Sequence, residues 1–187
     1  MNLMVYTLHS CYKGEIRLPG EDSNVTPSDA TTHRLQDVMN NPMLMYNIAE
    51  NPSRQILLRN VTIIMRGKEG IITLEKPLVF IDPNSIELVY NPGGNISTVK
   101  TFFRADYEKK QAESTKESME IITINQRKVV GTVTGGVDLI THPRIDRKFF
   151  AVDNAQIEVF YPEHTVEDTN YVLVNRDYVE SFRELVE

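Results

Sequence analysis

Hydrophobic and polar positions alternate in short runs along most of the chain, and this pattern predicts strands rather than helices. In the first half, the expected strands cover residues 3–8, 12–18, 56–65, 71–74, 77–81 and 85–90. In the second half, they cover residues 121–124, 128–134, 149–152, 156–161 and 171–174, while 178–185 fits either a strand or a helix. Many short strands at close spacing are typical of small β-barrels or sandwiches.

The clearest helical spacing lies at residues 33–50, after a polar loop at 21–32. Leu35, Val38 and Met39 are separated by three and four positions and therefore share one helix face. We expect a short helical insertion here, with its apolar side packed on the neighbouring strands.

The segment 100–118 is strongly charged, and either a solvated helix or a linker fits it. It predicts a boundary between one domain at 1–99 and a second domain at 119–187. Small barrels have a limited core, so we expect the two domains to pack together or the chain to oligomerise. Phe102, Phe103 and Tyr107 are candidates for that contact.

Three sequence blocks recur in the same order in both halves. YKGEIRLPG (12–20) matches VVGTVTGGV (129–137), ILLRNVTIIMRG (56–67) matches FAVDNAQIEVFY (150–161), and LVFIDPNSIEL (78–88) matches YVLVNRDYVES (171–181). The offsets between the copies are 117, 94 and 93 residues, so the first copy holds the extra polar and helical stretch between its first two blocks. The constant order of the blocks favours an internal duplication.

The residues that the copies share resemble a small bacterial domain related to Sm-like or SH3-like β-barrels. The carriers are Gly14, Arg34-Leu35-Gln36-Asp37, Arg59-Asn60-Val61 and Phe80-Ile81-Asp82 in the first copy, and Gly131, Arg144-Ile145-Asp146, Asp153-Asn154-Ala155 and Leu173-Val174-Asn175 in the second. The resemblance implies a mainly β protein of two small barrels in tandem, the first with a short helical insertion, and it implies no reaction. The Arg-Gly pair that the Sm-like group uses for RNA occurs here only as Arg66-Gly67.

The net charge of −6 and the pI near 5.3 argue against non-specific binding to duplex nucleic acid, which favours a basic domain. Cys11 is the single cysteine, which excludes an intrachain disulfide and a cysteine zinc cage. The opening residues do not resemble a signal peptide, and no apolar run approaches the roughly 20 residues of a membrane helix. We therefore expect a cytoplasmic protein without a membrane partner.

The densest basic cluster comprises Arg144, Asp146, Arg147 and Lys148, and it is followed directly by Phe149. Arginines beside an aromatic ring are a common way to hold single-stranded nucleic acid, and Arg66 could contribute from the first half. The other interpretation is that Phe149 begins a strand and packs in the core, while the charged neighbours pair at the surface. The cluster is the predicted contact for a ligand or partner.

No catalytic, cofactor or metal site is assigned from the sequence. His142, Asp146, Glu163, His164 and Glu167 have suitable ligand types for a metal, but their spacing does not make them converge, and 163–168 resembles a hairpin loop. His9 and Cys11 share one face of a strand, without a recognisable oxyanion element, so a buried structural cysteine is preferred.

These observations favour a non-enzymatic binding or scaffold protein that acts through protein–protein contacts or self-assembly. The alternative is an Sm-like protein that binds single-stranded RNA through the cluster at 144–150 and Arg66. A metal-dependent hydrolase around His142 and His164 is the least favoured hypothesis.

Overall fold

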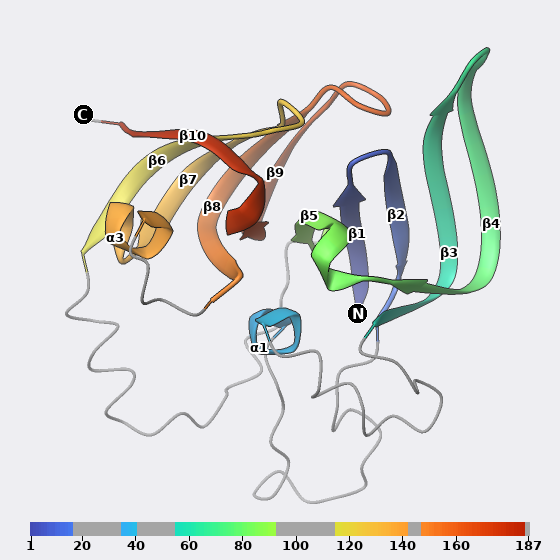
Figure 1. Cartoon of the computed structure of the whole chain (residues 1–187), viewed down its shortest axis with the longest axis horizontal. Coiled ribbons are helices and arrows are strands. Elements are labelled where there is room, and N and C mark those ends of the chain that lie inside the picture. The colour runs from blue at the N-terminus through green and yellow to red at the C-terminus, as the bar shows by residue number, and fades with distance from the viewer. Residues whose placement is uncertain (17–34, 41–54, 93–114, 142–146, 186–187) are drawn as a thin grey trace, which may run out of the picture.

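A computed structural model describes residues 1–16, 35–40, 55–92, 115–141 and 147–185 (Figure 1). In the first half the elements are β1 (Asn2–Thr7), β2 (Ser10–Glu15), α1 (Leu35–Asn40), β3 (Ile56–Gly67), β4 (Gly70–Ile81), the 3-10 turn η2 (Pro83–Ser85) and β5 (Ile86–Tyr90). In the second half they are β6 (Lys116–Thr123), β7 (Lys128–Thr134), α3 (Gly136–Thr141), β8 (Phe149–Val159), β9 (Thr165–Asn175), η3 (Arg176–Tyr178) and β10 (Val179–Glu184).

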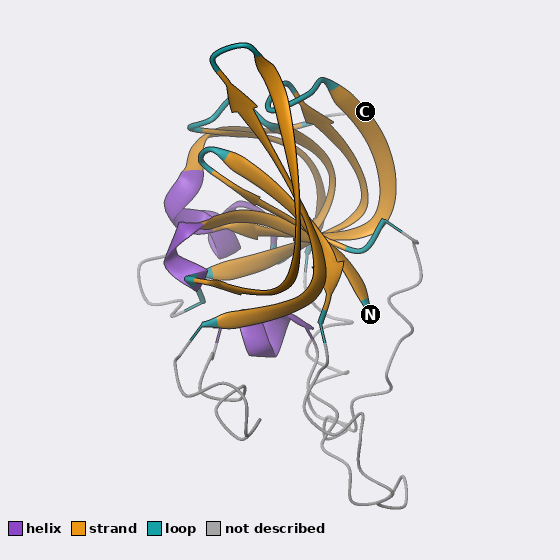
Figure 2. Cartoon of the chain, turned by 90° about the vertical axis from the view of Figure 1, so that its right-hand side faces the viewer, coloured by secondary structure: helices purple, strands orange, loops and turns teal. Residues whose placement is uncertain are grey.

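All ten strands belong to one antiparallel sheet with the order β10-β6-β7-β8-β9-β5-β1-β2-β3-β4. The sheet is strongly curved, and the long β3–β4 hairpin projects at one end of it (Figures 1 and 2). Each half contributes five adjacent strands in the same order, in which the fifth strand returns to lie beside the first. The two halves meet where β5 pairs with β9.

The pairing registers repeat between the halves, residue by residue. Leu3 lies opposite Gly14 in β1–β2, and Met119 lies opposite Gly131 in β6–β7. Ile56 lies opposite Ile81 in β3–β4, and Phe150 lies opposite Val174 in β8–β9. The offsets between β2 and β7, β3 and β8, and β4 and β9 are the same 117, 94 and 93 residues that relate the sequence blocks.

The local irregularities repeat as well. Asn60 in β3 and Asn154 in β8, 94 residues apart, both adopt positive φ angles of 50° and 48°, a conformation that asparagine tolerates better than most residues. Each interrupts the pairing of its strand with the preceding strand. The bend brings the backbone close to Gly14 or Gly131, where a side chain would collide with the neighbouring strand.

Two clusters of buried side chains form the core, and the central strands contribute to both. Val5 of β1 belongs to the first core and its neighbour Tyr6 to the second, because successive residues of a strand point to opposite faces. Val172 of β9 lies in the second core, whereas Leu173 lies in the first. The central part of the sheet is therefore buried on both faces and is shared by the two cores.

The expectation of two closed barrels is wrong, although the chain is mainly β with little helix. The outer edge of β9 pairs with β5 of the first half instead of pairing with β10 to close the second half into a barrel. Because β4 and β10 then stand at opposite ends of the order, the sheet stays open.

Several strands are longer than the pattern predicted. Residues 71–74 and 77–81 form the single strand β4, and 149–152 and 156–161 belong largely to β8. The hairpin loop predicted at 163–168 is shorter than expected: Glu163 and His164 lie in the loop between β8 and β9, and β9 begins at Thr165, since polar residues on both faces at its start resemble a loop in sequence. Residues 178–185, left open between strand and helix, contain β10.

Within the predicted insertion at 33–50, the described part forms α1, and Leu35, Val38 and Met39 are buried in the first core as a shared helix face requires. Most of the charged segment 100–118, including Phe102, Phe103 and Tyr107, lies outside the described residues, and β6 already begins at Lys116. Among the described helices, none is long and apolar enough to cross a membrane.

Candidate functional site

The joint between the halves shows how an edge of this fold receives another strand. Leu88, Val89 and Tyr90 of β5 lie opposite Val174, Leu173 and Val172 of β9. The ladder is only three residue pairs long, so side chains must supply much of the stability. Leu173 and Phe149 of the second half are fully buried in the first core, while Leu88 and Tyr90 of the first half are buried in the second core.

Polar side chains complete the joint at both ends of the ladder. Asn40 of α1 pairs with the backbone of Phe149 like a strand neighbour: its Nδ2 donates to the carbonyl at 2.9 Å, and its Oδ1 accepts from the N–H at 2.7 Å. Asn175 donates from Nδ2 to the carbonyl of Ile86 at 2.6 Å, and the hydroxyl of Tyr90 donates to Glu167 at 2.9 Å.

Arg127 of the second half reaches into the first half and is completely buried. Its guanidinium forms an ion pair with Glu87, donates to the carbonyl of Thr7 at 2.8 Å, and lies 5.1 Å from the ring centre of Tyr6. Desolvation lowers the pKa of Arg127, and the negative charge of Glu87 opposes that shift. Glu87 occupies a bulge of β5, between the paired residues Ile86 and Leu88, which turns its side chain toward the other half.

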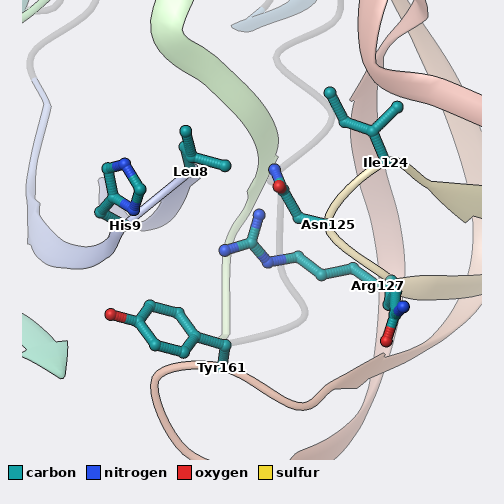
Figure 3. A pocket seen from close by; sticks show the side chains of 7 residues that line it. Leu8, His9, Ile124, Asn125, Arg127 and Tyr161 are labelled. Atoms are coloured by element: carbon teal, nitrogen blue, oxygen red, sulfur yellow. The ribbon is translucent and has the colours of Figure 1, made fainter.

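A shallow pocket of about 300 Å³ lies beside this ion pair, where the β1–β2 and β6–β7 hairpins and the loop after β8 meet. Figure 3 shows the side chain of Arg127 running between Asn125 and Tyr161 toward the hairpin that carries His9. Asn125 also donates to Glu87, so the polar groups nearest to the pocket are already engaged with each other. The pocket therefore lies at the surface of the joint.

The edge strand β4 exposes an unusual amount of apolar surface. Five large apolar side chains of β4 are between 39% and 50% exposed: Ile71, Ile72, Leu74, Leu78 and Phe80. Edge strands usually carry charges or proline to prevent pairing with other chains, and β4 does so only in its middle, at Glu75, Lys76 and Pro77. The remaining segments, 70–74 and 78–81, are uncharged and mainly apolar, which is typical of a strand with a paired neighbour.

The repeat shows what covers the equivalent positions in the second half. Phe80 and Leu78 of β4 correspond to Leu173 and Tyr171 of β9, which pack against the first core. Leu173 is fully buried there, whereas Phe80 is 41% exposed. The first half thus presents the same apolar positions that dock the second half, and within the described part of the chain no strand pairs with this edge.

The predicted basic cluster is not assembled into one surface by the described residues. Arg147 is exposed. Lys148 Nζ donates to Asn84 Oδ1 at 2.6 Å and forms an ion pair with Asp177 Oδ2 at 3.2 Å. Phe149 is fully buried and cannot stack on a base. Arg144 and Asp146 lie outside the described residues. Binding of RNA by this cluster stays a prediction, with Phe149 removed from the contact.

Arg66 lies at the turn end of the β3–β4 hairpin, opposite Ile71. Asn84 follows the other end of this hairpin, where Ile56 lies opposite Ile81. The backbone N–H of Arg66 donates to the hydroxyl of Tyr161 at 3.2 Å, and its side chain is exposed. The structure therefore separates Arg66 from Lys148 rather than joining them in one groove.

The metal hypothesis finds no support among the described residues, where no group of three or more ligand-type side chains converges. His164 contacts Glu158 at 3.3 Å and stacks on Phe160, while Glu167 accepts from Tyr90. His142 and Asp146 lie outside the described residues. Cys11 is buried, and this burial raises the pKa of its thiol to about 11, which disfavours the thiolate that a nucleophile needs.

Comparisons of the chain with protein-family models, with curated proteins and with solved structures find no match. The sequence could not have singled out β4 as an interaction surface, because its apolar residues resemble those of a buried strand. Their exposure depends on the position of β4 at the end of the sheet order.

Proposed function

We propose that this protein is a non-enzymatic binding or scaffold protein that recognises an extended, apolar strand of another polypeptide by adding it to the edge of β4. The observation that supports the proposal is the exposed apolar row on an edge strand, at positions that the second half of the same chain buries in a strand–strand joint. In strand addition, main-chain hydrogen bonds supply affinity and alternate side chains supply specificity.

The available segment for this recognition is 78–81, which corresponds to the part of β9 that pairs with β5. Val79 and Ile81 pack toward their own core, and Phe80 points away from it. An incoming strand would hydrogen-bond the free backbone groups and cover Phe80 and Leu78. Pro77 and Lys76 limit the contact on one side and discourage a longer, less specific pairing.

Site-specific photocrosslinking tests this function. Phe80 is replaced by p-benzoylphenylalanine, and Phe160, an aromatic residue that is 53% exposed and lies on neither edge strand, is replaced in a matched control. We expect the probe at Phe80 to crosslink in cells to one defined extended segment, identified by mass spectrometry, and the probe at Phe160 to give no such product. Equal, unselective labelling from both positions would contradict recognition at β4.

A further inference from the structure

We infer that the strand received by β4 is β10 of a second copy of this chain, so that identical chains assemble head to tail. This inference rests on the proposed function of β4 and names its partner. It follows from the internal joint, since β9 is the fourth strand of the second half and β5 is the fifth strand of the first half. Among the strands that the structure describes, those left without a second neighbour are the remaining fourth and fifth strands, β4 and β10.

The repeated registers predict how these edges would pair. In the joint, Val89 of β5 lies opposite Leu173 of β9. Phe182 is the equivalent of Val89, because Val89 pairs with Val5 of β1 and Phe182 pairs with Ile121 of β6. Phe80 is the equivalent of Leu173. The joint between copies therefore places Phe182 of one chain opposite Phe80 of the next.

The local structure of β10 matches that of β5. Glu87 in β5 and Glu180 in β10 each occupy a bulge, flanked by paired residues at the same positions. Each strand follows a 3-10 turn that is preceded by a capping residue: the side chain of Asp82 accepts from the N–H of Asn84 before β5, and that of Asn175 accepts from the N–H of Asp177 before β10. Thus β10 has the backbone shape that accepts β9 inside the chain.

Phe182 gives the second edge an apolar contact. It is only half-buried against the second core, whereas its equivalent Val89 is fully buried once β9 is in place. Phe80 of the next copy would cover the open side of Phe182, and Leu78 would follow it along the strand. Aromatic cross-strand pairs are among the more stabilising contacts between antiparallel strands.

The joint between copies lacks two features of the internal joint. First, Ser181 and Arg183 of β10 stand where β5 has the buried Leu88 and Tyr90. Second, Ser10 of the next copy stands where the internal joint has Arg127, so Glu180 has no partner for a buried ion pair. We therefore expect a weaker and concentration-dependent association. Because the contact joins two different edges, repeated association closes into a ring or extends into a filament.

Blocking one edge at a time tests the inference. Phe80→Glu closes β4 and leaves β10 free, whereas Phe182→Glu closes β10 and leaves β4 free. Light scattering with size-exclusion chromatography should show concentration-dependent assemblies of the unmodified chain, monomers of 21.4 kDa for each variant alone, and 42.8 kDa dimers for their equimolar mixture. Phe160→Glu is the matched control and should assemble like the unmodified chain.

The mixture distinguishes head-to-tail pairing from the alternatives. If Phe182→Glu chains dimerised by themselves while Phe80→Glu chains did not, the contact would be β4 with β4 and the inference would be wrong. If the unmodified chain and the mixture both stayed monomeric at millimolar concentration, self-assembly would be excluded. Crosslinking at Phe80 to another protein would then still support the proposed function.

A cysteine experiment covers the case in which Phe182→Glu does not fold. A chain carrying Phe80→Cys is mixed with one carrying Phe182→Cys, and the buried Cys11 remains in both. We expect a disulfide-linked dimer on mild oxidation, since directly opposite residues satisfy the Cα separation of a disulfide. A Phe160→Cys chain replaces Phe80→Cys in the control, and equal crosslinking of both mixtures would overturn the inference.

Discussion

The carboxylate of Glu87 in β5 and the guanidinium of Arg127, directly before β7, form an ion pair across the joint, with side-chain exposures of 0% and 1%. Desolvating two charges is costly, and the pair is not fully satisfied, since Glu87 Oε1 and Arg127 Nε have no hydrogen-bond partner. The pair favours one register between the halves, because in any other register each charge would be buried without its partner.

Arg127→Met should lower the free energy of unfolding by about 3–5 kcal/mol, because it leaves the carboxylate of Glu87 buried without its cation. The double variant Glu87→Leu with Arg127→Met should recover most of that loss. Urea unfolding of the two single variants and the double variant measures the coupling. Losses that simply add would show that the two charges act independently.

Gly131→Ala should destabilise the protein more than Gly14→Ala. A Cβ atom at residue 131 would lie 2.7 Å from the carbonyl oxygen of Asp153 and 3.0 Å from the Cα of Ala155, whereas at residue 14 the nearest backbone atom is 3.1 Å away. Since backbone cannot easily move aside, we expect a loss of about 1–3 kcal/mol at Gly131. Thermal unfolding of both variants tests the order, and equal losses would contradict it.

Asp153→Asn should stabilise the protein at neutral pH. Burial raises the pKa of Asp153 above its usual value of 3.8, so the folded chain keeps a proton that the unfolded chain releases. Stability is therefore lost as the pH rises from about 3.8 through the folded pKa, and Asn removes that loss. The unfolding free energies of the two proteins should converge below pH 3.8 and separate above it; parallel curves would refute the assignment.

Cys11 should react slowly with a thiol reagent in the folded protein. A pKa of about 11 leaves few thiolates at pH 8, and the side chain is only 2% exposed. We expect the rate with Ellman's reagent to rise more than 100-fold on unfolding in urea. Similar rates in the two states would show that Cys11 becomes accessible without unfolding. A slow reaction of Cys11 would also show that this residue does not compete with the introduced cysteines in the disulfide-crosslinking experiment.

Much of the strand content could be predicted because alternation and β-branched residues are local signals. The internal repeat could also be recognised from the sequence, because a bulge at Asn60 or Asn154 requires a nearby glycine and a fixed spacing. The matching blocks are 12–20 and 129–137, 56–67 and 150–161, and 78–88 and 171–181. Strand ends were less predictable. The first residues of β9, 165–168, are polar at three of four positions, so they did not resemble a strand.

The candidate site was hardly predictable. Lys148 and Phe149 were singled out by charge and aromaticity, yet one is held by Asn84 and Asp177 and the other is in the core. Phe80 and Phe182 passed unnoticed because an apolar residue in a strand is normally buried. Only the sheet order shows that their strands lie at the two edges of the described sheet.

The sequence by itself determined most of the strand pattern, a short helix within 33–50 and the residue-by-residue repeat, because these depend on spacing along the chain. The tertiary structure alone decided whether two barrels close or one sheet continues. That choice depends on β5 and β9, which are over seventy residues apart in the chain. Their pairing buries both faces of the central strands in two shared cores, and burial of apolar surface is the main driving force of folding.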